Sequence, residues 1–143
     1  MIDQPNANIL LRNMLEARAR NGLVTTPEQF SQLRNSAVNG TALILKDVLH
    51  RPIGYLAWAN ANKESILRLL TLGKFPCYSY EWNEGGFFLL LDVVIDVNSR
   101  QYGLSELKRF LSTKRAVVFS RRQKCRLYLR QRGNLRLTQL RNT

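Results

Sequence analysis

The stretch Leu89–Leu111, LLLDVVIDVNSRQYGLSELKRFL, changes character near its middle. Its first half belongs to an apolar run over residues 87–97 that is interrupted only by two aspartates. A run of this kind is typical of a buried strand. Residues 104–111 instead space their apolar side chains as a helix does. We therefore expect a central strand that passes through a short loop, Arg100–Ser105, into a helix.

The rest of the chain alternates between segments whose apolar residues are spaced as in a strand and segments whose apolar residues are spaced as in a helix. Thr26, Pro27 and Gln29 form a capping-box pattern that predicts the start of a helix. The whole pattern predicts an α/β (α+β) fold with a mixed central sheet flanked by helices. The expected helices cover residues 9–20, 27–38, 62–72, 104–111 and 135–140, and the expected strands cover residues 41–46, 53–59, 75–82, 87–97, 115–120 and 124–131.

Length and composition narrow the class of protein. The chain has 143 residues, 45% of them hydrophobic, which predicts one domain over residues 1–143 with a real core. It has no apolar stretch of membrane-spanning length and no secretory signal pattern, so we expect a cytoplasmic protein without a transmembrane segment. One histidine and two distant cysteines predict no metal site.

The positive charge is concentrated at one end of the chain. Residues 1–106 hold ten basic and ten acidic residues, whereas residues 107–143 hold twelve Lys and Arg and no Asp or Glu. The net charge of +12 therefore comes from the last quarter. Such a segment is either a solvated basic surface or a site for an acidic partner: a nucleic acid, an anionic membrane or an acidic protein.

The loop between the central strand and the helix is a candidate anion site. Free backbone N–H groups at a helix N-terminus and the helix dipole both attract phosphate. Arg100 would add charge, and Gly103 would let the chain approach a phosphate closely. The residues expected to bind are Arg100, Gln101, Tyr102, Gly103 and Ser105.

The motif Arg-x-x-Gly-x-Ser in this loop resembles the Gln/Arg-x-x-Gly-x-Gly/Ala signature of GNAT acetyltransferases. In those enzymes the corresponding loop holds the pyrophosphate of coenzyme A. A second set of residues is more distinctive: Ala57-Trp58-Ala59-Asn60, followed by Asp92 and Gly103. This set resembles the RTX toxin-activating lysine acyltransferases, the hemolysin-activating family, over roughly residues 28–141. Members of that family have a GNAT-like fold.

The resemblance implies acyl transfer. Members of the family move a fatty acyl group from acyl carrier protein to lysines of a protoxin, and a relative could act on a secreted, microcin-type peptide. Their catalytic pair is a histidine and an aspartate, and Asp92 matches the aspartate. The acyl donor would be acyl carrier protein with its phosphopantetheine thioester, with no permanently bound cofactor. An acidic carrier would be steered by basic residues of the last quarter: Arg121, Arg122, Lys124 and Arg126.

The chain departs from the family at the catalytic histidine. Arg20 or Asn21 stands at that position, and an arginine stays protonated and cannot act as a base. The only histidine, His50, falls in the turn between two strands, where it is at most a secondary catalytic candidate. Val93 also replaces the aromatic residue that follows the family aspartate.

Three functions therefore stay open. The chain is an acyltransferase, or a catalytically inactive GNAT-like binding or regulatory subunit, or a basic nucleic-acid-binding protein. Phe119 and Tyr128, which lie among the arginines of the last quarter, favour the third function. A homodimer or a partner subunit that supplies the missing base is compatible with the first two.

Overall fold

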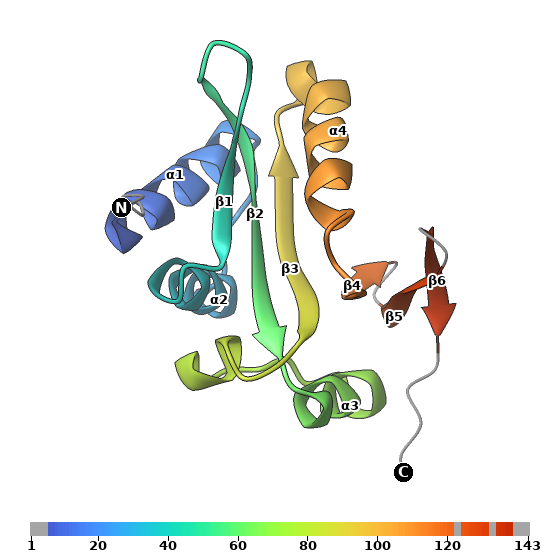
Figure 1. The fold of residues 1–143 in the computed structure, drawn as a ribbon. Helices are drawn as coiled ribbons and strands as arrows, with labels where there is room; N and C mark the ends of the chain where they lie inside the picture. The colour runs from blue at the N-terminus through green and yellow to red at the C-terminus, as the bar shows by residue number, and fades with distance from the viewer. Residues whose placement is uncertain (1–5, 122–123, 132–133, 139–143) are drawn as a thin grey trace.

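A computed structural model describes residues 6–121, 124–131 and 134–138. Two helices open the fold, and a hairpin, a third helix, a central strand and a fourth helix follow before three final strands (Figure 1). The predicted α/β class is confirmed. The helices are α1 (Ala7–Arg20), α2 (Pro27–Val38), α3 (Lys63–Leu72) and α4 (Arg100–Leu111), with short 3-10 helices η1 (Ser79–Trp82) and η2 (Val97–Ser99). The strands are β1 (Ala42–Lys46), β2 (Pro52–Ala61), β3 (Phe87–Ile95), β4 (Ala116–Arg121), β5 (Lys124–Gln131) and β6 (Asn134–Thr138).

The described strands form one mixed sheet in chain order, β1-β2-β3-β4-β5-β6. All neighbouring pairs are antiparallel except β3 and β4, which are parallel and are joined through α4. The β3–β4 pairing is short: only Phe88↔Val117 and Leu89↔Val118 lie in register. The two strands then diverge, and no strand in the described part of the chain pairs with the second half of β3 on that side.

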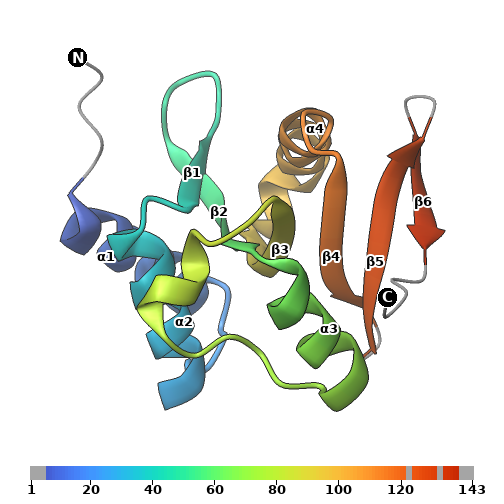
Figure 2. The same ribbon diagram turned by 60° about the horizontal axis from the view of Figure 1, so that its bottom comes forward.

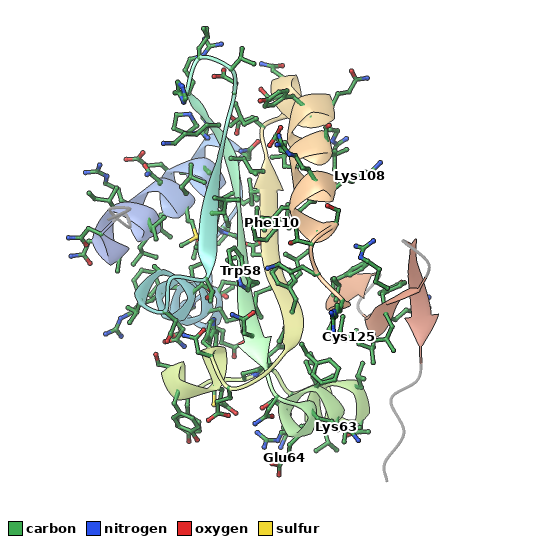
Figure 3. The ribbon with its side chains drawn as sticks, in the orientation of Figure 1. Trp58, Lys63, Glu64, Lys108, Phe110 and Cys125 are labelled. Atoms are coloured by element: carbon green, nitrogen blue, oxygen red, sulfur yellow. The ribbon has the colours of Figure 1, made fainter. Side chains whose placement is uncertain are left out.

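Helices cover both faces of the sheet. On one face, Met14 of α1 and Leu33 of α2 pack on Tyr55 of β2, and all three side chains are fully buried or nearly so. On the other face, α4 packs through an aromatic cluster. Figure 3 shows Trp58 of β2 and Phe110 of α4 between sheet and helix, with ring centroids 5.1 Å apart.

Local sequence signals explain most element boundaries. Thr26 caps α2 and Gln29 completes the capping box, as expected. A register shift between Ala57 and Trp58 leaves Leu91 as an extra residue of β3, which is a β-bulge. No described helix is long and apolar enough to cross a bilayer.

Two expected elements are wrong. Residues 75–82 form a loop and η1 instead of a strand, because the Glu81 carboxylate accepts hydrogen bonds from the backbone N–H groups of Cys77 and Tyr78. These donors are satisfied locally and need no strand partner. The expected helix over residues 135–140 is instead strand β6, which pairs with β5; residues 139–140 lie outside the described residues.

Gly54 lets β2 and β3 approach closely. A Cβ atom at this position would lie 2.1 Å from the backbone oxygen of Val94. We predict that Gly54→Ala lowers the free energy of unfolding by roughly 2–3 kcal/mol, because the backbone of β3 must move. Gly86 has open space around it, so Gly86→Ala should stay within about 0.5 kcal/mol of wild type. Urea denaturation measures both, and equal effects would contradict the packing role of Gly54.

Candidate functional site

Asp92 lies in the middle of β3 and points toward α1. Its Oδ2 accepts a hydrogen bond from Nη1 of Arg18 at 2.7 Å, and the Tyr55 hydroxyl donates to the same oxygen. The Arg18 side chain is 5% exposed and that of Asp92 is 27% exposed. The candidate catalytic aspartate is therefore one half of a largely buried ion pair.

Arg18 is fixed by further partners. Its Nε donates to Thr25 Oγ1 at 2.9 Å, and its Nη2 donates to the Val24 carbonyl at 2.8 Å and to Gln29 Oε1 at 3.2 Å. Burial lowers the pKa of Arg18, but Tyr55 and Asp92 outweigh burial and the pKa is raised. A guanidinium in this setting is a permanent cation, and Asp92 is its counterion.

Tyr55 completes this cluster. Burial raises the pKa of Tyr55 well above its usual range, and the negative charge of Asp92 raises it further. The hydroxyl therefore stays protonated and donates to Asp92. Arg18, Tyr55 and Asp92 thus pair and hydrogen-bond with one another, as the charges of a buried structural ion pair must.

Arg20 and Asn21, at the end of α1, both contact a second carboxylate. Arg20 Nε lies 3.1 Å from Asp96 Oδ2, and Asn21 Nδ2 donates to Asp96 Oδ1 at 2.8 Å. The Arg20 side chain is 43% exposed and that of Asp96 is 22% exposed. The two contacts fix the C-terminal end of α1 to the turn that follows β3.

A cavity of about 330 Å³ opens beside this turn. It lies between the end of α1, the second half of β3 and the start of α4. Most of its lining residues are apolar, but polar and apolar atoms share its walls, with Asn21 and Arg100 as the polar side chains. The lining residues are Asn21, Leu23, Val93, Val94, Ile95, Val97, Arg100 and Leu104.

The backbone of β3 contributes hydrogen-bonding groups to this cavity. Asp96 N–H donates to the Ile53 carbonyl at 2.8 Å, and Tyr55 is in register with Val94. Antiparallel ladders alternate hydrogen-bonded and non-bonded pairs, so the N–H and C=O groups of Val93 and Ile95 point away from β2. These groups face the side where β4 has diverged.

The predicted phosphate loop is the first turn and a half of α4. Arg100 begins the helix and lines the cavity, whereas Gln101, Tyr102 and Ser105 are exposed on the helix surface. Gly103 is buried, and a Cβ there would lie 2.4 Å from Ile95 Cγ2. The structure therefore gives Gly103 a helix-packing role, and its expected approach to a phosphate stays a prediction.

The other expected residues lie elsewhere. His50 is exposed in the β1–β2 turn with φ 62°, whereas Asp92 lies well inside β3. Arg126 is exposed on β5; Arg121 and Lys124 pair through their backbones at the β4–β5 turn, and Arg122 lies outside the described residues. The structure thus brings Arg100 together with the end of α1, and leaves His50 and Arg126 apart from the cavity.

Sequence reasoning missed Arg18, Leu23 and Leu104. Arg18 had a signal, because it follows Met14 by four positions and so falls on the buried face of α1. Leu23 and Leu104 carried no signal beyond being apolar. Among the described residues, no three His, Cys, Asp or Glu side chains gather as metal ligands.

We predict that Arg18→Leu lowers the free energy of unfolding by about 3 kcal/mol, because Asp92 loses its counterion. The double variant Arg18→Leu/Asp92→Leu should recover part of this loss, since neither charge is then left unpaired. Arg12→Leu, at an exposed position of the same helix, is the control and should stay within about 0.5 kcal/mol. Urea denaturation of the four proteins tests the ion pair, and a double variant less stable than Arg18→Leu would argue against it.

The raised pKa of Tyr55 predicts that the free energy of unfolding falls at alkaline pH. Its pKa is raised in the folded protein, whereas in the unfolded chain it ionises near pH 10. Its contribution is therefore complete below about pH 10 and is lost as the pH rises further. Wild type should lose stability more steeply than Tyr55→Phe, by up to about 1.4 kcal/mol per pH unit. Denaturation between pH 8 and 11 measures the two slopes, and parallel slopes would contradict the prediction.

No family model matches the chain, and no curated protein sequence matches it. What the cavity beside β3 does must therefore follow from its own contacts.

Proposed function

We propose that this chain is a GNAT-like domain of the toxin-activating acyltransferase type that binds the phosphopantetheine arm of an acyl carrier protein and does not transfer its acyl group. The open edge of β3 at the cavity supports binding of the phosphopantetheine arm. The Arg18–Asp92 ion pair supports the absence of acyl transfer, because it engages the candidate catalytic aspartate.

The open strand edge suits an amide-bearing chain. A phosphopantetheine arm contains two secondary amides, and an extended chain can pair them with the outward N–H and C=O groups of Val93 and Ile95. The apolar walls of the cavity, formed by Leu23, Val97 and Leu104, suit the hydrocarbon parts of the arm and of a thioester. The parallel strand–helix–strand unit β3–α4–β4 that creates this edge supports the GNAT-like assignment.

The start of α4 suits the phosphate. Arg100 lies at the cavity wall, and Ser99 caps α4 without a side-chain hydrogen bond to the helix. The positive end of a helix of twelve residues and one guanidinium then face the same space. Because Arg126 on β5 is not among the residues that line the cavity, we place the docking surface for the carrier at the cavity rim with Arg100.

The cavity offers no available base for a lysine amine. An amine must lose its proton before it attacks a thioester. Asp92 is engaged by Arg18 and Tyr55, and the polar side chains that line the cavity are an amide and a guanidinium. A binding or regulatory subunit is therefore the better supported function.

Acyl transfer to a protein or peptide lysine is the second candidate, and Asp96 favours it. Asp96 stands between two lining residues, Ile95 and Val97, and its partner Arg20 is well exposed. An exposed ion pair of this kind is weak and can open. If transfer occurs, Asp96 is better placed than Asp92 to act as the base.

We predict that holo acyl carrier protein binds more tightly than the apo form, which lacks the arm. Arg100→Ala should weaken holo-carrier binding by about fivefold to tenfold, the loss of one charge-assisted contact. Arg109→Ala, an exposed arginine near the other end of α4, is the matched control and should bind as wild type does. Calorimetric titration measures the affinities. Equal binding of apo and holo carrier, or equal losses in the two variants, would contradict the arm site.

We further predict that a radiolabelled acyl thioester on the carrier stays intact when it is mixed with the protein and a lysine peptide. Transfer that is lost in Asp96→Asn and kept in Asp92→Asn would establish the second candidate instead. Thermal unfolding of both variants shows whether a loss reflects the fold, since Asp92→Asn also weakens the ion pair with Arg18.

A further inference from the structure

Among the described side chains of the basic quarter, Lys114, Arg115 and Arg126 lie beside or on β4 and β5 and do not line the cavity. Arg100 begins α4, and a helix of twelve residues is about 18 Å long, so β4 starts far from the cavity mouth. Figure 2 shows the end of β4 and the start of β5 on the α3 side of the molecule, and α3 contacts β5. These basic side chains are therefore available to a partner other than the one that enters the cavity.

The two faces of β4 and β5 differ. Val118 and Leu127 point toward α3 and are buried with it. Side chains alternate along a strand, so Val117, Phe119 and Tyr128 point to the opposite face. We call the outer part of that face, formed by Phe119, Arg126 and Tyr128, the β4–β5 platform.

Helix α4 reaches only the beginning of this face. The guanidinium of Arg130 donates from Nε to the Lys114 carbonyl and from Nη2 to the Leu111 carbonyl, each at 2.8 Å. These bonds anchor the C-terminal end of α4 to β5. Val117, level with this end, is fully buried. Phe119 packs in part against the same apolar cluster, and both Phe119 and Tyr128 are half-buried.

The platform combines stacked aromatic rings with cations. Phe119 and Tyr128 stack with ring centroids 4.7 Å apart and an interplanar angle of 9°. Arg126 is exposed and lies directly opposite Phe119 in the strand register. At the near end, the Lys114 ammonium lies 4.9 Å from the centre of the Phe110 ring, and Arg115 is exposed.

The positive charge and the aromatic rings of the platform together indicate which class of partner it binds. Residues 107–143 contain no acidic side chain, so the surface complements a polyanion. An acidic protein or a lipid headgroup would use the cations alone. Planar rings beside arginines on an open sheet face are instead what successive nucleotide bases require, because every base has a face that can stack.

We propose that the β4–β5 platform binds single-stranded nucleic acid, with bases stacked on Phe119 and Tyr128 and phosphates held by Arg126, and by Lys114 and Arg115 at the near end. The site is independent of the cavity beside β3, so either can exist without the other.

The test is fluorescence anisotropy with a labelled single-stranded RNA of twelve mixed nucleotides and with a duplex DNA of the same length. Wild type should prefer the single strand and should lose affinity steeply with salt. Tyr128→Leu should weaken single-strand binding roughly tenfold, because it keeps the apolar bulk and removes the stacking face. The salt slope should not change, because no charge is lost.

Two matched controls separate the platform from general charge. Arg126→Glu should weaken binding and flatten the salt slope, whereas Arg34→Glu, the same change at an exposed position of α2, should leave the slope as in wild type. Tyr80→Leu removes an exposed tyrosine elsewhere and should bind as wild type does. Circular dichroism confirms that each variant is folded.

Several outcomes would overturn the proposal. Equal affinity for duplex DNA, together with full single-strand binding by Tyr128→Leu, would show a polyanion surface without base stacking. Tight binding to vesicles of anionic lipid or to acyl carrier protein that is lost in Arg126→Glu, with no binding to RNA, would assign the platform to those partners instead.

Discussion

The ion pair between Arg18 and Asp92 is the constraint on which the first half of the structure depends. A carboxylate in the middle of a largely buried strand is tolerated only when it is paired and hydrogen-bonded. Arg18 meets this need from α1, and its remaining donors fix the connection to α2. One buried cation therefore sets the position of two helices against β2 and β3. The aspartate that interrupts the apolar run of β3 thus has a structural explanation.

The same contacts decide which chemistry the site can support. A base must offer a lone pair to a proton, and the Asp92 oxygen that faces α1 accepts from both Arg18 and Tyr55. The arginine and the asparagine that end α1 are likewise committed, because they hold Asp96. The structure shows Asp92 as the counterion of Arg18, and its catalytic role stays a prediction.

Local patterns in the sequence predicted the elements whose causes are local. The capping box of α2, the β1–β2 hairpin and the passage from β3 into α4 each depend on residues within a few positions of one another. Residues 75–82 resemble a strand in sequence because many of them are apolar or aromatic. In the structure, however, the Glu81 carboxylate binds the backbone N–H groups of Cys77 and Tyr78, and the segment forms a loop and a 3-10 helix. The partner of Asp92 lies 74 positions away, and no spacing rule reaches that far. Sequence could show that Arg18 falls on a buried face, but not which carboxylate it meets there.

The short pairing of β3 with β4 leaves room for the cavity beside α4. Parallel strands that pair over their whole length would bury the edge of β3 and leave no cavity beside α4. Here the pairing covers only Phe88 and Leu89, and the bulge at Leu91 follows directly. A bulge increases local twist, which turns β3 away from its neighbour. The divergence turns backbone groups of β3 toward the cavity, while β5 stays attached to the end of α4 through Arg130. The cavity at one end of α4 and the partly exposed Phe119, Arg126 and Tyr128 beyond the other end are therefore separate surfaces, and ligands of different shape suit the two.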